Sequence, residues 1–273
     1  MLNRTAEQNT SRHLFLPIHQ KLKCKTQSLI LLSWLFVAFH SSAIERWSSE
    51  QLIPTMIRKL PEMGVVAINA SPVNIQDDVP FIGIIRLKLS ELKTKNISIL
   101  ADESDPEANK KMAYYHQITG APGLCLFSED GKSARISLSL EILFAGLKEP
   151  NDKFENAWFT LLHEINNAGK RDKFGFLEEA LRKGAISRDD FIDKYVSLEV
   201  DSMLTAIKEL EDGLRQIRQK HPSVSFGYID KQYGKLKSMK YFDIISYYIN
   251  SRLGFYYGEY YDNKRGRYNS GSP

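Results

Sequence analysis

Three polar side chains share one side of a helix predicted over residues 152–169. They are His163, Glu164 and Asn167, and spacings of three and four residues place groups on the same side of a helix. An imidazole and a carboxylate are groups that can bind a metal ion or move a proton, and an amide can support both. Periodicity alone favours a simpler alternative, in which the three side chains face water.

A second carboxylate, Glu199, stands where an apolar side chain is expected. The long helix predicted after Ser187 has an apolar stripe, and Glu199 falls inside it, whereas Asp201 falls outside. A buried carboxylate is costly unless it is paired, so its partner is expected to be a metal, a histidine or a basic side chain. The alternative is a glutamate at the edge of the stripe that reaches water or pairs with Lys or Arg.

The helix that carries His163 shows a clear apolar face. Seven apolar residues recur at spacings of three and four, which is helical spacing and predicts burial of that face. They are Phe154, Ala157, Trp158, Leu161, Leu162, Ile165 and Ala168. The chain from Asp152 to about Lys220 therefore reads as almost entirely helical.

The preceding part of the chain mixes strands and helices. Short apolar runs bounded by turn residues predict strands, and Asp105-Pro106 predicts the start of a helix. The expected strands are Val65–Ile68, Phe81–Leu89, Asn96–Leu100 and a hairpin of Leu124–Phe127 with Ala134–Leu140. The fold class predicted is α+β, with a small mixed sheet and its hairpin packed on a predominantly helical carboxy-terminal half.

The segment from Trp158 to Ala168 resembles the active-site helix of zinc metallopeptidases of the zincin group. In that pattern, H-E-x-x-H, two histidines bind zinc and the glutamate between them is the general base. The resemblance assigns the first ligand to His163, the base to Glu164 and the small residue that follows to Ala168. Asn167 stands where the second histidine is expected, and an amide is a much poorer zinc ligand than imidazole.

Two further features extend the resemblance to the glutamate-ligand branch of zincins. The hairpin ending near Leu140 comes just before the helix, as does the edge strand that binds substrate backbone in that group. Glu199 follows His163 by 36 residues and matches the glutamate that supplies the third ligand. The resemblance implies a zinc metallopeptidase with a weak or inactive metal site formed by His163, Glu199 and Asn167, with Glu164 as its catalytic residue.

The amino-terminal segment has the pattern of a signal peptide over residues 1–43. Lys21, Lys23 and Lys25 precede the apolar run 28–39, and Ser41 and Ala43 stand at a small-residue cleavage site. We expect export to the periplasm or to the outside of the cell. An uncleaved leader that anchors the protein to a membrane is the alternative. Residues 44–262 are expected to form one domain, mixed over 44–145 and helical over 146–262, and residues 263–273 a disordered tail.

Composition excludes several classes of function. The net charge of +4 belongs to the leader, because residues 44–273 hold equal numbers of basic and acidic residues, so nucleic acid is not an expected partner. Neither a phosphate-binding loop nor a dinucleotide fingerprint is present in the sequence, which makes nucleotide chemistry unexpected. Cys24 and Cys125 are too few for a disulfide framework, and Cys125 reads as a small core residue.

A non-catalytic function remains open beside the zincin-like one. The hairpin edge, the long helix and the tyrosine-rich end of the chain could bind a peptide or protein partner in an exported binding or assembly protein. The two possibilities differ in one spatial expectation. The zincin-like interpretation requires Glu199 to lie near His163, and a large separation between the two residues would exclude that interpretation.

Overall fold

The computed structural model of the protein describes residues 58, 60–94, 98–100, 113, 116–117, 120–127 and 133–270. All of these belong to one unit of the chain, residues 41–273. The predicted signal peptide and most of the helix predicted from Asp105 lie outside the described residues.

The first part of the described chain contains five short strands. Strands β1 and β2 form an antiparallel hairpin, and β5 is the central strand of a second sheet, parallel to β3 and antiparallel to β4. The elements are η2 (Pro61–Gly64), β1 (Val65–Ile68), β2 (Ser71–Asn74), η3 (Gln76–Asp78), α3 (Phe81–Thr94), β3 (Ser98–Leu100), β4 (Gly123–Phe127), β5 (Ser133–Leu138) and α5 (Leu140–Leu143).

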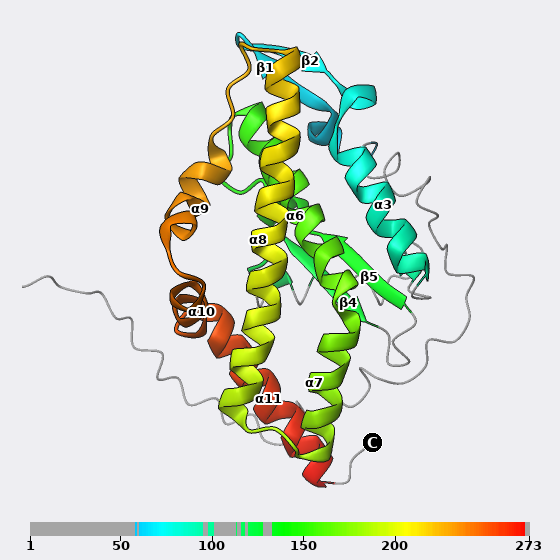
Figure 1. Ribbon diagram of the computed structural model, residues 1–273, viewed down its shortest axis with the longest axis vertical. Helices are drawn as coiled ribbons and strands as arrows, with labels where there is room; N and C mark the ends of the chain where they lie inside the picture. The colour runs from blue at the N-terminus through cyan, green and yellow to red at the C-terminus, as the bar shows by residue number, and fades with distance from the viewer. Residues whose placement is uncertain are drawn as a thin grey trace, which may run out of the picture. The chain divides into compact units, whose positions relative to one another are not determined.

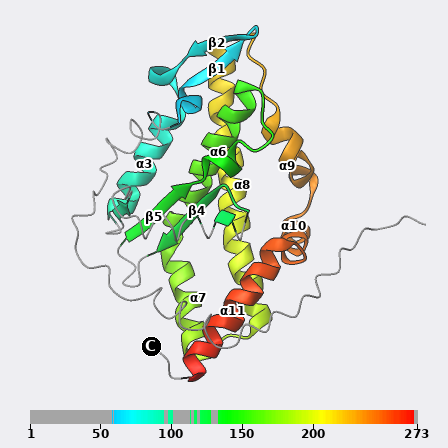
Figure 2. The ribbon, with the colours of Figure 1, turned by 180° about the vertical axis from the view of Figure 1, so that it is seen from behind.

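The second part is helical. Figure 1 shows the longest helix, α8, running beside α6 and α7. Figure 2, which views the molecule from behind, shows α11 crossing α8 and α7. The helices are α6 (Pro150–Gly169), α7 (Arg171–Lys183), α8 (Arg188–Lys220), α9 (Tyr228–Ser238), α10 (Tyr241–Ile249) and α11 (Arg252–Ser270).

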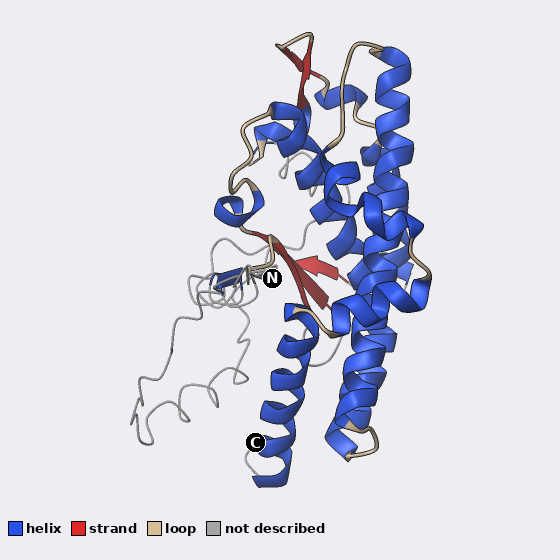
Figure 3. Cartoon of the chain, turned by 90° about the vertical axis from the view of Figure 1, so that its left-hand side faces the viewer, coloured by secondary structure: helices blue, strands red, loops and turns tan. Residues whose placement is uncertain are grey.

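The predicted fold class is confirmed. Helices dominate the described chain, and Figure 3 shows how small a part of it is strand. The predicted hairpin is present as β4 and β5, which pair antiparallel from Gly123 with Leu138 to Phe127 with Ala134. Both strands pack against α6, so the sheet lies directly beside the helix that carries His163.

The strand predicted over Phe81–Leu89 is wrong, because this segment lies in helix α3. An alternating pattern would place Ile85, Leu87 and Leu89 on one face, whereas the structure buries Ile85 and Leu89 and leaves Leu87 64% exposed. The buried set Phe81, Ile85, Leu89 and Leu92 follows helical spacing instead. The short alternating stretch therefore misled the prediction, and the longer period decides the structure.

The carboxy-terminal tail also differs from the prediction. Residues 263–270 continue helix α11 instead of forming a disordered tail, and residues 271–273 lie outside the described part. The helix is tied back to the body of the domain by its own side chains. Tyr261 donates a hydrogen bond to the carbonyl oxygen of Ile186 at 3.0 Å, and Arg265 donates one to that of Leu181 at 3.5 Å.

Helix α6 is buried on more sides than its periodicity predicts. All seven predicted apolar positions are at most 1% exposed, which confirms the predicted core face. Trp158 lies at the centre of that face, against the ring of Phe81 at 5.1 Å, and its indole donates a hydrogen bond to the carbonyl oxygen of Met63 at 2.8 Å. On the polar side, Thr160, Glu164 and Asn167 are buried as well. Exposure to water is therefore the wrong interpretation for Glu164 and Asn167.

Candidate functional site

His163 and Glu199 meet between helices α6 and α8. The Nε2 atom of His163 lies 3.1 Å from Oε2 of Glu199, and both side chains are less than a fifth exposed. A carboxylate only accepts hydrogen bonds, so Nε2 of His163 is the donor. Glu199 thus sits in the apolar stripe of α8 because a histidine on the neighbouring helix pairs with it.

Asn167 joins the two carboxylates of the site. Its Nδ2 atom donates to Oε2 of Glu199 at 3.0 Å and more distantly to Oε2 of Glu164 at 3.4 Å. Its Oδ1 atom is buried and accepts no hydrogen bond from the residues that the structure describes. The residue at the altered motif position therefore acts as a donor that bridges two acids.

Glu164 lies against the sheet. A Cβ atom added at Gly123, the first residue of β4, would lie 2.8 Å from Oε1 of Glu164 and 2.5 Å from Cγ2 of Thr160. Only glycine permits this close approach of strand and helix. In the described sheet β4 has one paired side, along β5, so Glu164 sits beside an edge strand.

The charges of the site perturb one another. Burial is the main cause that raises the pKa of Glu164, to about 7, and the charge of Glu199 adds to it. Burial alone would lower the pKa of His163, but the hydrogen bond to Glu199 and the two nearby carboxylates hold it above its ordinary value. Burial also opposes ionisation of Glu199, yet the contacts with His163, Tyr257 and Asn167 keep its pKa below the ordinary value. The site thus holds an ionised Glu199 and a Glu164 that titrates near neutrality.

Tyr257 completes the site and was not predicted from the sequence. Its hydroxyl donates to Oε1 of Glu199 at 2.6 Å, from helix α11. The sequence showed only a tyrosine-rich end of the chain. The available signal was the spacing of Tyr257, Tyr260 and Tyr261, which places three hydroxyls on one side of a helix.

The other histidine and cysteine candidates have structural roles. The ring of His116 is 3% exposed, and its Nδ1 donates to the carbonyl oxygen of Ala121 at 2.7 Å while Nε2 lies 3.0 Å from Oγ of Ser137. Burial, with the charges of Glu164 and Glu199 nearby, raises the pKa of the Cys125 thiol well above its ordinary value. A thiol in that state is a poor nucleophile. Cys125 is partly buried and packs against the hydrophobic core, so it lies at the edge of the core and not inside it.

The donor set fits zinc only in part. The 3.1 Å between Nε2 of His163 and Oε2 of Glu199 is close to the ~3.3 Å that separates two ligands of one tetrahedral zinc. The third position holds Asn167, which presents a nitrogen donor to Glu199. In the described part of the chain, no group of three or more His, Cys, Asp or Glu is placed to hold a metal ion. These residues therefore do not fit a catalytic zinc ion, which takes three protein ligands.

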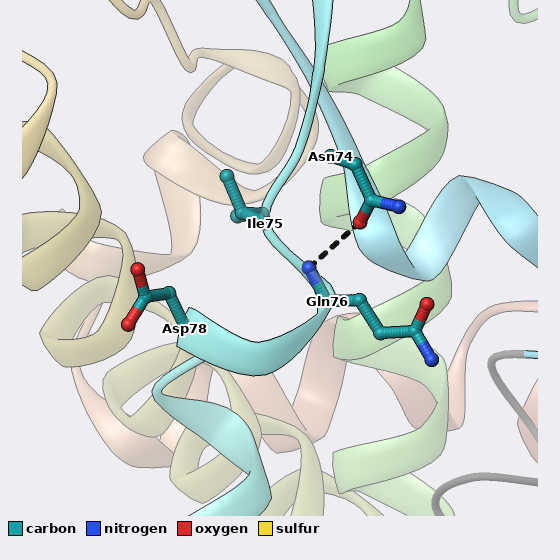
Figure 4. A pocket seen from close by; sticks show the side chains of 4 residues that line it. All are labelled: Asn74, Ile75, Gln76 and Asp78. Atoms are coloured by element: carbon teal, nitrogen blue, oxygen red, sulfur yellow. Dashed lines mark hydrogen bonds between the residues drawn. The ribbon is translucent and has the colours of Figure 1, made fainter.

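A small surface pocket lies elsewhere. It has a volume of about 210 Å³ and is lined by Asn74, Ile75, Gln76 and Asp78 (Figure 4). Asp78 pairs with Lys220 at 2.9 Å, and Lys220 lies 21 residues beyond Glu199 on α8, which is about 30 Å along a helix. The pocket is thus remote from the His163 cluster and has no buried, perturbed acid.

Comparison with protein-family models, with curated proteins and with solved structures found no match to this chain. Among the described residues, no helix is both long and apolar enough to cross a membrane.

Proposed function

We propose that this is an exported, metallopeptidase-like protein whose altered site binds zinc weakly and hydrolyses peptides little or not at all. The observation that carries the proposal is the 3.1 Å approach of His163 and Glu199 from helices α6 and α8. These are the two residues that the zincin resemblance assigns as ligands, and they are 36 positions apart in the chain.

Two more contacts support the same assignment. Glu164, the residue in the position of the base, points toward an edge strand at Gly123. A peptide that added to such an edge by backbone hydrogen bonds would pass beside that carboxylate. Asn167 contacts both Glu164 and Glu199, as a residue one turn beyond His163 must if the site is built on one helix face.

The loss of hydrolysis follows from the same contacts. Asn167 replaces an imidazole by an amide, and Oε2 of Glu199 already accepts hydrogen bonds from His163 and Asn167. A metal must displace these hydrogen bonds before it can bind to Glu199. Two good ligands and a poor third give a weak site, so no step of a reaction is assigned to a metal in this chain.

Zinc binding by the purified protein tests the proposal. Equilibrium dialysis of the wild type, His163→Ala and Glu199→Gln should show weak zinc binding that both substitutions remove, with negligible cleavage of unstructured peptide substrates. Tight, stoichiometric zinc in the wild type, or wild-type binding that survives both substitutions, would contradict it. The first of these results would indicate that another residue completes a working site.

A second candidate function is the non-catalytic binding of a peptide or protein. It is favoured by three large aromatic side chains that the structure exposes on α10 and α11, Phe242 (78%), Phe255 (65%) and Tyr247 (58%). Zinc binding separates the two candidate functions. A non-catalytic binding protein does not need zinc at His163, so His163→Ala should leave its zinc binding unchanged.

A further inference from the structure

Glu199 is held from two directions. Its Oε2 atom accepts hydrogen bonds from His163 and Asn167 on α6, and its Oε1 atom accepts one from Tyr257 on α11. The two oxygens of one carboxylate thus receive donors from two helices, and the orientation of the carboxylate depends on both.

Tyr257 is itself firmly placed. It is 8% exposed, and its ring packs on that of Tyr195 with the ring centroids 4.4 Å apart. Tyr195 precedes Glu199 by four residues, so it lies on the same side of α8 one turn away. The hydroxyl of Tyr257 is therefore directed at Glu199 by the packing of its own ring.

The hydrogen bond from Tyr257 to Glu199 is a strong one. An O–H group that donates to a carboxylate at 2.6 Å is a charge-assisted hydrogen bond, which is shorter and stronger than one between neutral groups. Metal-binding carboxylates are commonly held by such outer partners, and loss of one costs about 10–100-fold in metal affinity.

We infer that Tyr257 is the positioning residue of the candidate site. Its hydroxyl fixes Glu199 so that Oε2 faces His163 and Asn167, and it makes the geometry of the site depend on the docking of helix α11. The role of Tyr257 toward a metal rests on the proposed function. Its role in placing Glu199 does not, and it can be measured in the metal-free protein.

Helix α11 offers a matched control. Tyr261 is four residues after Tyr257 and also donates its hydroxyl, but to the backbone carbonyl of Ile186 at 3.0 Å. Tyr257→Phe and Tyr261→Phe therefore delete the same atom from the same helix, and only the first removes a contact with Glu199.

The first measurement is the proton signal of His163 Nε2–H in metal-free, ¹⁵N-histidine-labelled protein, assigned by its loss in His163→Ala. We expect a hydrogen-bonded signal in the wild type and in Tyr261→Phe, and its loss or exchange broadening in Tyr257→Phe. A signal that is absent in the wild type, that survives Tyr257→Phe, or that both variants lose alike would overturn the inference.

The second measurement concerns metal and uses the Asn167→His background. Tyr257→Phe should lower the zinc affinity there by about 10–100-fold, and Tyr261→Phe should leave it within about threefold. Equal zinc affinity in both variants would overturn the role toward metal. If Asn167→His binds no zinc at all, the proposed function fails, and the proton signal alone decides whether Tyr257 positions Glu199.

Discussion

The Nε2 atom of His163 and the Oε2 atom of Glu199 lie 3.1 Å apart, although the two residues are 36 positions apart in the chain. One belongs to α6 and the other to α8, and the second carboxylate oxygen of Glu199 is occupied by Tyr257 of α11. Three helices therefore meet at one carboxylate, whose side chain is less than a fifth exposed.

The stability of the His163–Glu199 pair should depend on pH in metal-free buffer. The pKa of His163 is raised in the folded protein. Its contribution to the free energy of unfolding is therefore complete below the ordinary pKa of 6.5 and is lost as the pH rises through the raised pKa. The pKa of Glu199 is lowered in the folded protein. Its contribution to the free energy of unfolding is therefore present above the ordinary pKa of 4.5 and is lost as the pH falls through the lowered pKa.

Urea unfolding of the wild type and His163→Gln, measured with a chelator from pH 4 to 9, checks this dependence. The difference in the free energy of unfolding should be largest between pH 4.5 and 6.5 and should shrink toward pH 9. A difference that grows with rising pH would show that His163 is neutral in the native pair.

Gly123→Ala should destabilise the protein. The added methyl group would meet Thr160 and Glu164 at distances that real side chains do not tolerate, so either these two side chains or β4 must shift. A loss of about 1–3 kcal/mol in the free energy of unfolding is expected for such overpacking. Gly83→Ala is the control, since a Cβ there meets nothing within 4 Å and alanine favours the helix. Equal effects of the two substitutions would mean that Gly123 and Glu164 are not in contact.

Trp158→Ala should cost about 3–5 kcal/mol, the usual range for a buried large aromatic side chain. Trp158 is 0% exposed and also donates a hydrogen bond to the carbonyl oxygen of Met63. Phe176→Ala is the control, because Phe176 is 73% exposed and its removal should change stability by no more than about 0.5 kcal/mol. A loss below about 1 kcal/mol for Trp158→Ala would place α6 in a different orientation.

Export and cleavage after Ala43 remain a prediction from the sequence, since residues 1–43 lie outside the described part of the chain. Mass spectrometry of the mature protein from the native host should find Ile44 as the first residue. An intact Met1 in the soluble cytoplasmic fraction would contradict both export and cleavage.

Local periodicity predicted the core face of α6 and the need of Glu199 for a partner, but not the burial of Glu164 and Asn167. The apolar positions of α6 fix which side of the helix is buried, and the place of Glu199 in an apolar stripe requires a partner. That His163 is this partner follows from the sequence only through the zincin resemblance. The contact itself is a property of how α6 packs on α8.

Other parts could not be predicted because their causes are not local. Leu87 belongs to a short alternating stretch that reads as a strand, and only the burial of Leu92 beyond it reveals the helix. Tyr257 meets Glu199 across 58 residues. The spacing of the tyrosines in α11 indicates a shared side of the helix, but it does not indicate which residue that side contacts. The end of α11 is polar, and it is helical where contacts such as that of Arg265 with Leu181 tie it to α7.

The measurement that tests the central claim most directly is a zinc titration of Asn167→His beside the wild type and His163→Ala. Histidines four residues apart on a helix point the same way, so the new imidazole should complete a three-ligand set with His163 and Glu199. We predict weak binding in the wild type, none in His163→Ala, and at least about tenfold tighter binding in Asn167→His, which corresponds to ~1.4 kcal/mol. No gain in Asn167→His, together with no change in His163→Ala, would contradict the account, because the face of α6 that meets Glu199 would then have no capacity for metal.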